Sequence, residues 1–378
     1  MSWWRRQRPF EFLTSVPFSS YVVFLEAVFF IFTPIGFLID IADLGTNPPS
    51  RVAAMLLISG GIAVAYATAA IKKPKVMPVV IALHLVFSTE LGRVLPGRTS
   101  ALGADTLRTR LTFDAMATLV SIIAGYGLFI RFIRKEGARY VRAHTEIALA
   151  RDIHRLLVPP ISRHVGRFEF RGLSIPSGEV GGDLVDLVDD GERWIGYVAD
   201  VSGHGVASGL LMAMVKSAAR MRLRDGPSIA ALMNDLNLVL LDLKKPEMYV
   251  TFACVQFDGS DIHFSLAGHL PILHYRSAQS SISELSVPQI PIAMFEDRRF
   301  TAARVDCGPG DLFVIVTDGL TEVFDAKDRE FGFDRLKALV AQHAHAPLDT
   351  LTGAVLSAVH AHGPQDDDQT LLVVRASA

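Results

Sequence analysis

Aspartate stands where an apolar run begins or ends at four places in the C-terminal two thirds of the chain. These residues are Asp183, Asp200, Asp318 and Asp367. Each motif alone is more typical of a turn, so the signal lies in their combination. Carboxylates gathered at one sheet edge repel one another unless cations neutralise them, and oxygen-rich sites select hard ions such as Mg²⁺ or Mn²⁺. Two such ions can activate water and bind a phosphoryl oxygen, so the pattern predicts chemistry on phosphate esters.

A β-hairpin is expected to bring the first two aspartates together. Strand-like runs lie on both sides of Asp190-Gly191, a pair that is typical of a tight turn. With this pair in the turn, Asp183 faces Val198 and lies one diagonal from Asp200, roughly 7 Å away between backbones. Glycines then permit a bend, and residues 206–222 predict a helix rich in Ala, Leu and Met.

The charges divide unevenly along the chain. The whole chain has 37 Lys and Arg and 39 Asp and Glu. Residues 1–150 hold 16 of the basic and 9 of the acidic residues, so residues 151–378 hold 21 basic and 30 acidic ones. Short apolar runs broken by Gly, Asp and Pro predict a strand-rich domain there. Nucleic acid is bound through clustered Lys and Arg, so this acidic domain is not expected to have nucleic acid as a partner.

The first third of the chain contains four apolar stretches, each near the ~20 residues that cross a bilayer as a helix. The stretches run over about 16–39, 52–71, 76–95 and 112–133. Basic segments at the start, at 72–75 and at 131–135 are expected in the cytoplasm by the positive-inside rule. We therefore expect an all-α four-helix transmembrane region in the inner (cytoplasmic) membrane, followed by a cytoplasmic domain. Basic residues between 93 and 110 would lie outside, so a hairpin pair in place of two full spans is an alternative.

A linker helix is expected between the two parts. Apolar residues recur at helical spacing as far as Leu157, and Pro159-Pro160 ends the pattern. This apolar stripe either packs on its own domain or forms a short parallel coiled coil with a second chain. The coiled coil is the favoured alternative, and it predicts a homodimer through the linker helix. The expected organisation is a membrane region over 1–134, a linker over 135–160 and a catalytic domain over 161–378.

A set of motifs follows the linker in a fixed order. The set comprises residues 146–160, Gly181-Gly182-Asp183, 200–205, 267–271, 317–322, Phe331-Gly332 and 367–370. In this order the motifs resemble those of the SpoIIE-type branch of the PP2C-like serine/threonine phosphatases, which includes stress-response phosphatases. The resemblance covers about residues 146–375. One departure is Ala293, near which the family usually has glycine, so the shape of that loop is an open question.

The resemblance implies an α+β fold, the PP2C-like α-β-β-α sandwich of two antiparallel sheets flanked by helices. It also implies two bound ions, Mn²⁺ or Mg²⁺. Asp200 would bridge both ions with help from the Val201 carbonyl, Asp183 would support one ion, and Asp318 and Asp367 would complete the other site.

The roles of three further residues are less direct. Asp368 either joins the metal ligands or supports them from behind. His204 and His269 lie between glycine and turn residues, where packing or hydrogen bonding is expected in place of metal ligation.

The function implied by the resemblance is hydrolysis of phosphoserine or phosphothreonine. The family branch suggests a phosphorylated STAS-domain protein, an anti-sigma factor antagonist in a bacterial partner-switching pathway, as the substrate. Two alternatives are a catalytically silent PP2C-like scaffold or membrane sensor, and a transporter with a regulatory domain.

Overall fold

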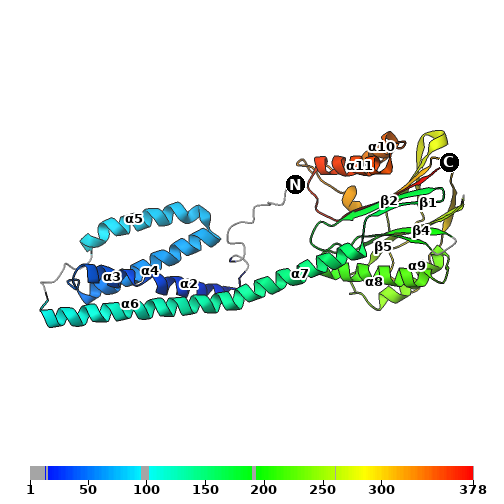
Figure 1. The fold of residues 1–378 in the computed structure, drawn as a ribbon. Helices are drawn as coiled ribbons and strands as arrows, with labels where there is room; N and C mark the ends of the chain where they lie inside the picture. The colour runs from blue at the N-terminus through cyan, green and yellow to red at the C-terminus, as the bar shows by residue number, and fades with distance from the viewer. Residues whose placement is uncertain (1–12, 14–15, 95–101, 190–192, 260, 378) are drawn as a thin grey trace. The chain divides into compact units, whose positions relative to one another are not determined.

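The computed structural model describes residues 13, 16–94, 102–189, 193–259 and 261–377 (Figure 1). The side chains of 89–94 and 143–144 are outside this description. Contacts divide the chain into two units, Met1–Thr145 and Glu146–Ala378. This division falls inside the expected linker helix, and the boundaries at 134 and 160 stay predictions.

Apolar helices are present at all four stretches predicted in the first unit. Their bounds are α2 Phe18–Phe32, α3 Ile35–Ala42, α4 Pro49–Lys72, η1 Pro74–Val76, α5 Met77–Val94 and α6 Ala104–Phe132. Within the described residues, three helical segments are long and apolar enough to cross a membrane, namely Phe18–Ala42, Pro49–Lys72 and Ala104–Leu157. The third predicted span corresponds to α5, where the described apolar segment Pro74–Ser88 is shorter.

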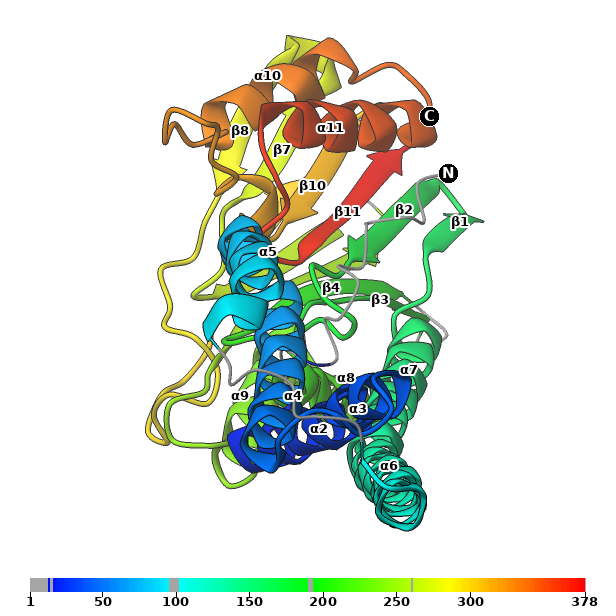
Figure 2. The same cartoon turned by 90° about the vertical axis from the view of Figure 1, so that its left-hand side faces the viewer.

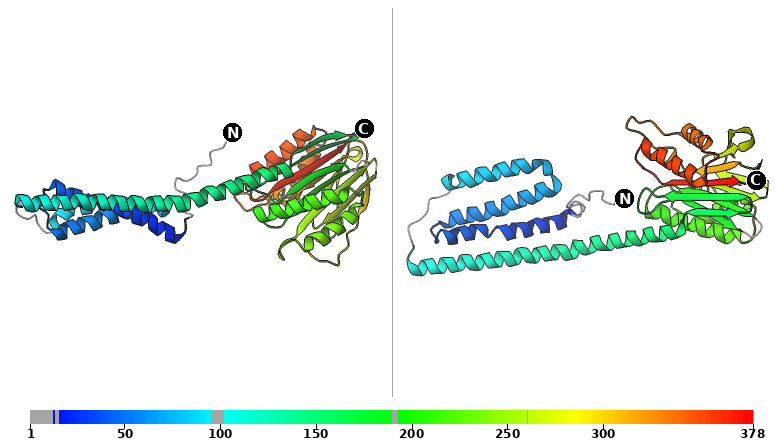
Figure 3. Two further views of the ribbon diagram at one scale, coloured as in Figure 1. Left: turned by 60° about the horizontal axis from the view of Figure 1, so that its bottom comes forward. Right: turned by 45° about the horizontal axis from the view of Figure 1, so that its top comes forward.

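The first predicted span consists of two helices with a break before Pro34. Proline has no N–H to donate and its ring crowds the preceding helical turn, so α2 ends and α3 begins at this point. Helix α2 packs against α4 and α6 (Figure 3). Glycines allow the close approach: a Cβ at Gly60 would lie 2.5 Å from the Phe29 ring, and one at Gly125 would lie 2.9 Å from the Ile31 backbone nitrogen.

The helix after α6 is not a regular α-helix throughout. A π-helical turn, η2 Ile133–Gly137, precedes α7 Ala138–Leu157. Within this turn Glu136 is buried and accepts a 2.6 Å hydrogen bond from the Ser20 hydroxyl at the start of α2. π-Helical turns are rare and short, and this tertiary contact helps to hold one here. The sequence pattern predicted a helix over this segment but not its π turn.

The second unit contains two antiparallel sheets. The six-stranded sheet has the order β1-β2-β11-β10-β7-β8, and the five-stranded sheet has the order β3-β4-β5-β6-β9. The strand bounds are β1 Ile161–Val165, β2 Phe168–Ile175, β3 Leu184–Asp189, β4 Trp194–Val201, β5 Val250–Asp258, β6 Asp261–Ala267, β7 Ile272–Arg276, β8 Ser281–Leu285, β9 Ala303–Asp306, β10 Leu312–Val316 and β11 Gln369–Ala376.

Helices cover the outer face of each sheet (Figure 2). Helices α8 Val206–Leu223 and α9 Ile229–Leu241 pack on the five-stranded sheet, and α10 Phe333–Gln342 and α11 Leu348–His362 pack on the six-stranded one. Short 3₁₀ turns, η3 Ser277–Gln279 and η4 Asp318–Leu320, complete the unit. The α-β-β-α sandwich predicted from the sequence is therefore confirmed, as is the helix predicted over 206–222.

Aromatic side chains fill the centre of the sandwich. Phe170, Phe257 and Phe313 are almost fully buried, and their rings meet edge-on with centroids 5.4 and 5.8 Å apart for the two successive pairs. A second apolar core lies between the six-stranded sheet and α10 and α11. Strand β10, which supplies side chains to both cores, is buried at every residue, as expected for the apolar run Leu312–Val316.

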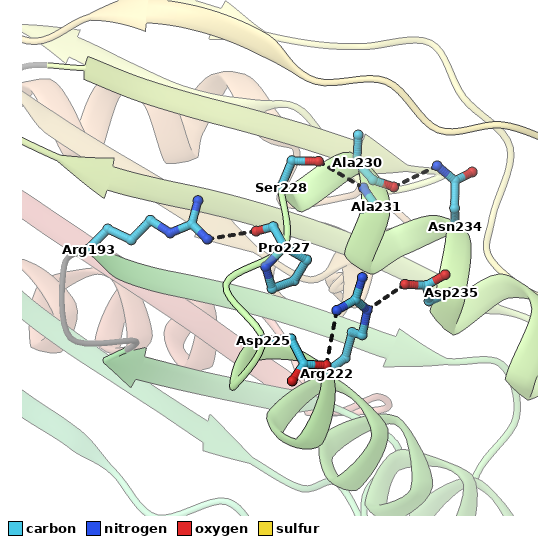
Figure 4. A network of polar contacts seen from close by, with 9 residues as sticks. All are labelled: Arg193, Arg222, Asp225, Pro227, Ser228, Ala230, Ala231, Asn234 and Asp235. Carbon is cyan, nitrogen blue, oxygen red and sulfur yellow. Dashed lines mark hydrogen bonds and ion pairs between the residues drawn. The ribbon is translucent and has the colours of Figure 1, made fainter.

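Polar contacts hold the connection between α8 and α9 (Figure 4). The Ser228 hydroxyl accepts the N–H of Ala231 at 3.2 Å and caps α9. Arg222 donates to Asp225 and Asp235 at 3.2 and 2.6 Å, and Arg193 donates to the Pro227 carbonyl at 2.8 Å. These contacts tie the helix pair to the start of β4.

The register of the β3–β4 hairpin differs from the predicted one. Val185, not Asp183, pairs with Val198, and the last pair is Asp189 with Trp194. Four residues therefore connect the strands, where a two-residue turn was expected; the predicted turn pair, Asp190-Gly191, lies outside the described residues. The prediction was wrong because Asp-Gly also occurs in longer hairpin loops. Continued by one position, the observed register sets Asp183 opposite Asp200.

Candidate active site

The acidic residues singled out in the sequence come from both sheets. Asp200 is the second-last residue of β4, and Asp183 directly precedes β3, so both belong to the five-stranded sheet. Asp318 opens η4, with one residue between it and the end of β10, and Asp367 lies just before β11, so both flank strands of the six-stranded sheet. The sandwich thus carries carboxylates from four strand ends to one region.

Burial and mutual repulsion raise the pKa values of these carboxyl groups. Burial and the negative charges of Asp318, Asp367 and Asp368 raise the pKa of Asp200 to about 7. Burial and Asp200 raise the pKa of Asp183 well above its usual range. Burial and then Asp367 raise the pKa of Asp318. Each carboxyl is therefore reluctant to ionise beside its neighbours, as expected for acids crowded in a partly dry site.

The side chain of Asp183 is held from the opposite sheet. Its Oδ2 accepts a 2.8 Å hydrogen bond from the hydroxyl of Thr317, the residue that follows β10. The same hydroxyl oxygen accepts the backbone N–H of Thr370, on β11, at 3.1 Å. Thr317 is 2% exposed, so neither bond competes with much water. The threonine therefore fixes one carboxylate relative to the two central strands of the other sheet.

Asp368 serves the loop that leads into Asp183. Its Oδ1 accepts hydrogen bonds from the backbone N–H and hydroxyl of Ser177 at 2.7 and 3.2 Å. Its Oδ2 accepts the backbone N–H of Gly182 at 2.7 Å and that of Asp183 at 3.4 Å. Both oxygens are thus engaged by the loop, and the choice between a ligand role and a supporting role for Asp368 stays a prediction.

Glycine is required at two positions because backbones approach closely. A Cβ at Gly319 would lie 2.1 Å from the Asp368 carbonyl oxygen, and one at Gly182 would lie 2.9 Å from the Val201 carbonyl oxygen. Contacts under 3 Å cannot be kept without movement of the backbone. The glycines beside Asp183 and Asp318 in the sequence motifs are therefore explained by packing at this site.

A buried ionic network anchors the helix that follows Asp200. Asp186, on β3, accepts hydrogen bonds from Tyr197 and from two nitrogens of Arg220, each at 2.7 Å, and lies 3.1 Å from the Lys216 amine. These contacts hold the pKa of Asp186 below its usual value in spite of burial. Since Lys216 and Arg220 lie on α8, the network fixes this helix on the strand that begins beside Asp183.

The two histidines for which the sequence predicts packing or hydrogen bonding differ in their surroundings. His204 is exposed in the loop before α8. His269 Nδ1 lies 3.2 Å from the Leu270 carbonyl oxygen, and burial lowers the pKa of its imidazole to about 4. His269 is therefore neutral at pH 7 and packs in the turn after β6.

The donor set suits a hard divalent cation. All its side chains are carboxylates, and the loop brings the Val201 carbonyl oxygen close to Gly182. Mg²⁺ and Mn²⁺ prefer such oxygen ligands, and their charge would relieve the repulsion that raises the pKa values. As the side chains lie, no three His, Cys, Asp or Glu residues in the described part of the chain form a ready metal cage. The ligand assignments therefore stay predictions.

Sequence reasoning missed Thr317, Ser177 and the network around Asp186. A signal for Thr317 was present, because it stands between a buried strand and Asp318, where a hydroxyl can bond across the sheets. Ser177 precedes the Gly-Gly-Asp motif in a Pro-Ser-Gly turn, but nothing in this turn indicates Asp368 as its partner. Such partners, far apart in the chain, are set by the sandwich.

Known proteins are similar in sequence to the C-terminal unit, which contains the acidic residues. Residues 190–377 match the sequence model of the family described as stage II sporulation protein E (SpoIIE). The phosphoserine phosphatase RsbU of Bacillus subtilis is 23% identical over 212 residues, covering 56% of this chain and 63% of RsbU. The phosphoserine phosphatase RsbP of the same organism is 27% identical over 241 residues, covering 60% of this chain and 57% of RsbP. The chain thus spans about three fifths of the length of these relatives.

Solved structures show the same fold. The SiaA-PP2C domain of Pseudomonas aeruginosa has a TM-score of 0.53 and 21% identity, and the match covers 63% of this chain and 98% of that domain. The RsbU and RsbW domains of a Mycobacterium tuberculosis protein have a TM-score of 0.50 and 23% identity, and the match covers 59% of this chain and 61% of that one. Residues 190–377 of the C-terminal unit thus match the SpoIIE family, and the unit has the fold of PP2C-like domains.

Proposed function

We propose that this protein is a metal-dependent phosphatase that hydrolyses phosphoserine or phosphothreonine in a protein substrate. The observation that carries the proposal is the position of four aspartates at the ends of four strands in two sheets, with a Thr317–Asp183 hydrogen bond that joins the two sheets. Two curated relatives named phosphoserine phosphatases support it. Retention of all four acids counts against the catalytically silent scaffold.

Asp183, Asp200, Asp318, Asp367 and the Val201 carbonyl would hold two Mn²⁺ or Mg²⁺ ions, with Asp368 behind them. Such ions supply a nucleophilic water near neutral pH and positive charge for the phosphoryl oxygens.

The protein's own part is positioning. Thr317 keeps the Asp183 carboxylate directed into the site, and Asp368 holds the loop before it. Buried Asp186 ties α8, and with it the loop after Asp200, to β3. Rigidly placed groups need not reorganise during the reaction. This preorganisation is the main source of electrostatic catalysis.

We further propose a phosphorylated STAS-type anti-sigma factor antagonist as the substrate. This proposal rests on the family resemblance of the motifs and on the likeness to RsbU and RsbP. The acidic balance of the C-terminal part, 30 Asp and Glu against 21 Lys and Arg, argues against nucleic acid as a partner.

The proposed location is the inner membrane, with four passes and a cytoplasmic catalytic domain. Three long apolar helices and the shorter α5 support an anchor of this kind. A homodimer through α7 is the proposed assembly, because Leu149, Ile153 and Leu156 are exposed at coiled-coil spacing, at 61, 49 and 81%.

Phosphate release by the full chain in detergent tests the proposal. The substrate is a STAS-domain protein phosphorylated on serine, with Mn²⁺, Mg²⁺ or a chelator added. We expect turnover that requires one of the two ions. Absence of turnover with both ions, from protein whose C-terminal unit melts cooperatively, would support the silent scaffold.

A further inference from the structure

A cavity of about 610 Å³ lies within the first unit, between α3, α4 and α6. Its walls include Phe37 of α3, Val52 and Leu56 of α4, and Arg110, Phe113 and Asp114 of α6. This volume falls within the range of small-molecule sites, roughly 300–1,000 Å³. The cavity is far along the chain from the acids of the C-terminal unit, and none of its residues belongs to the proposed phosphatase site.

Two buried aspartates and one arginine gather beside this cavity. Asp40, at the end of α3, has no exposed surface, and Asp114 is 3% exposed. Arg110 donates to Asp40 Oδ2 at 2.9 Å and also to the Asn47 carbonyl oxygen. The other oxygen of Asp40 accepts the N–H of Asn47 at 3.1 Å. The hydrogen bonds of this arginine are thus directed to Asp40 and Asn47, while its positive charge also acts on Asp114.

Asp114 is left with an incomplete set of partners. Its carboxyl contacts that of Asp40, but its Oδ2 is buried and has no hydrogen-bond partner. A buried carboxylate oxygen without a hydrogen-bond partner is destabilising, so such an atom beside a cavity favours a bound donor. Ionisable groups in a membrane-spanning bundle indicate function by default, because their burial is costly. The missing partner is a cation or a strong N–H donor.

The apolar walls define the rest of the ligand. The rings of Phe37 and Phe113 meet edge-on, with centroids 6.3 Å apart and planes at 82°, and Val52 and Leu56 add aliphatic surface. Aromatic rings attract cations as well as apolar groups. A bare metal ion would not use these walls, whereas a molecule with both an ammonium group and an apolar body would use the Asp114 carboxylate and the apolar walls together.

We propose that this cavity is a binding site for an organic amine, whose ammonium group pairs with Asp114 and whose apolar body lies between Phe37, Phe113 and the α4 wall. The site is independent of the phosphatase proposal. It gives the membrane unit a ligand chemistry of its own, recognition of a protonated alkyl- or arylamine.

Binding of tryptamine to the full chain in detergent micelles tests this site, measured by calorimetry. Tryptophol, in which a hydroxyl replaces the ammonium group, and indole-3-propionate, which carries a negative charge, are the matched probes. We expect tryptamine to bind at least tenfold more tightly than either. Equal binding of tryptamine and tryptophol, or no binding of tryptamine, would overturn the proposal.

Two variants locate the binding. Asp114→Asn is expected to weaken tryptamine binding at least tenfold, because the amide keeps the shape but not the charge. Asp105→Asn, an exposed acid on the same helix, is the matched control and is expected to bind like the unaltered chain. Unchanged affinity in Asp114→Asn would refute the assignment.

A third variant guards against the chance that Asp114→Asn fails to fold. Ala53→Phe, at the cavity wall, adds a ring and leaves every charge in place. We expect it to weaken tryptamine binding at least tenfold while the chain elutes as before from size exclusion. Normal tryptamine affinity in Ala53→Phe would show that the amine binds elsewhere.

Discussion

The Thr317 hydroxyl donates a 2.8 Å hydrogen bond to Asp183 and so joins the two sheets at their acidic edge. Thr317→Val keeps the shape but leaves Asp183 and the Thr370 N–H without this partner. We expect a loss of about 1–3 kcal/mol in the free energy of unfolding and reduced phosphate release. Thr352→Val is the control, because this buried hydroxyl bonds only within α11 among the described contacts. Equal effects of the two changes would contradict the role given to Thr317.

Removal of one charge from the acidic site should abolish activity. Asp200→Asn and Asp318→Asn each remove a proposed anionic ligand but little packing, so we expect phosphate release to fall by about 10³-fold or more in a chain that still folds. Circular dichroism and size exclusion check the fold. Asp235→Asn, which loses only a surface ion pair with Arg222, should keep its activity. Substantial turnover by either site variant would mean that the catalytic residues lie elsewhere.

The stability of the metal-free protein should fall as the pH rises. Unfolded Asp200 ionises near its ordinary pKa of 3.8, whereas in the folded chain burial and the neighbouring acids raise this pKa to about 7. Between these values the unfolded state has lost a proton that the folded state keeps, so stability decreases with pH and levels off above about 7. Melting in chelator from pH 5 to 8 should show the decline.

Asp200→Asn provides the check on this explanation. The variant lacks the titrating group, so its melting temperature in chelator should depend less on pH and should exceed that of the unaltered chain at pH 8. Added Mn²⁺ should stabilise the unaltered chain more than the variant. An identical pH dependence in both proteins would exclude Asp200 as the cause.

Ala293, near which the resemblance leads us to expect glycine, adopts a left-handed backbone conformation with φ 66°. Its N–H donates to the Asn237 side chain at 2.8 Å, which helps to hold the strained loop. Ala293→Gly should change stability by less than about 1 kcal/mol, because relief of roughly 1–2 kcal/mol of strain offsets the lost buried methyl group, worth about 0.8. Ala293→Val should destabilise clearly, since β-branched residues avoid this region. Equal melting of Ala293→Val and the unaltered chain would contradict the strain.

Gly319 has no room for a side chain. The Cβ of Gly319→Ala would lie 2.1 Å from the Asp368 carbonyl oxygen, so the backbone must move beside Asp318. We expect a loss of roughly 1–3 kcal/mol in stability together with most of the activity. Gly353→Ala is the matched control in α11, where a Cβ meets nothing within 4 Å and a helix gains roughly 0.5–1 kcal/mol. Similar melting temperatures for the two variants would argue against the steric requirement.

The acidic residues and the strands beside them could be predicted from the sequence, because apolar runs flanked by aspartate indicate buried strands that end at a carboxylate. The pairing register was not visible, since an Asp-Gly pair does not fix the length of a hairpin loop. Thr317 and Ser177 could not be assigned, because their partners lie more than a hundred residues away. The π turn at 133–137 was missed for a similar reason: its contact from Glu136 reaches Ser20.

The division of the acids between two sheets has a thermodynamic consequence. If cations bind between Asp200 on one sheet and Asp318 on the other, any protein or ligand that slides the sheets apart must weaken cation affinity. Reciprocity requires that cation binding oppose that sliding by the same free energy. Metal occupancy would then depend on the separation of the two sheets. A regulator that changes this separation would alter hydrolysis without contacting the acidic residues.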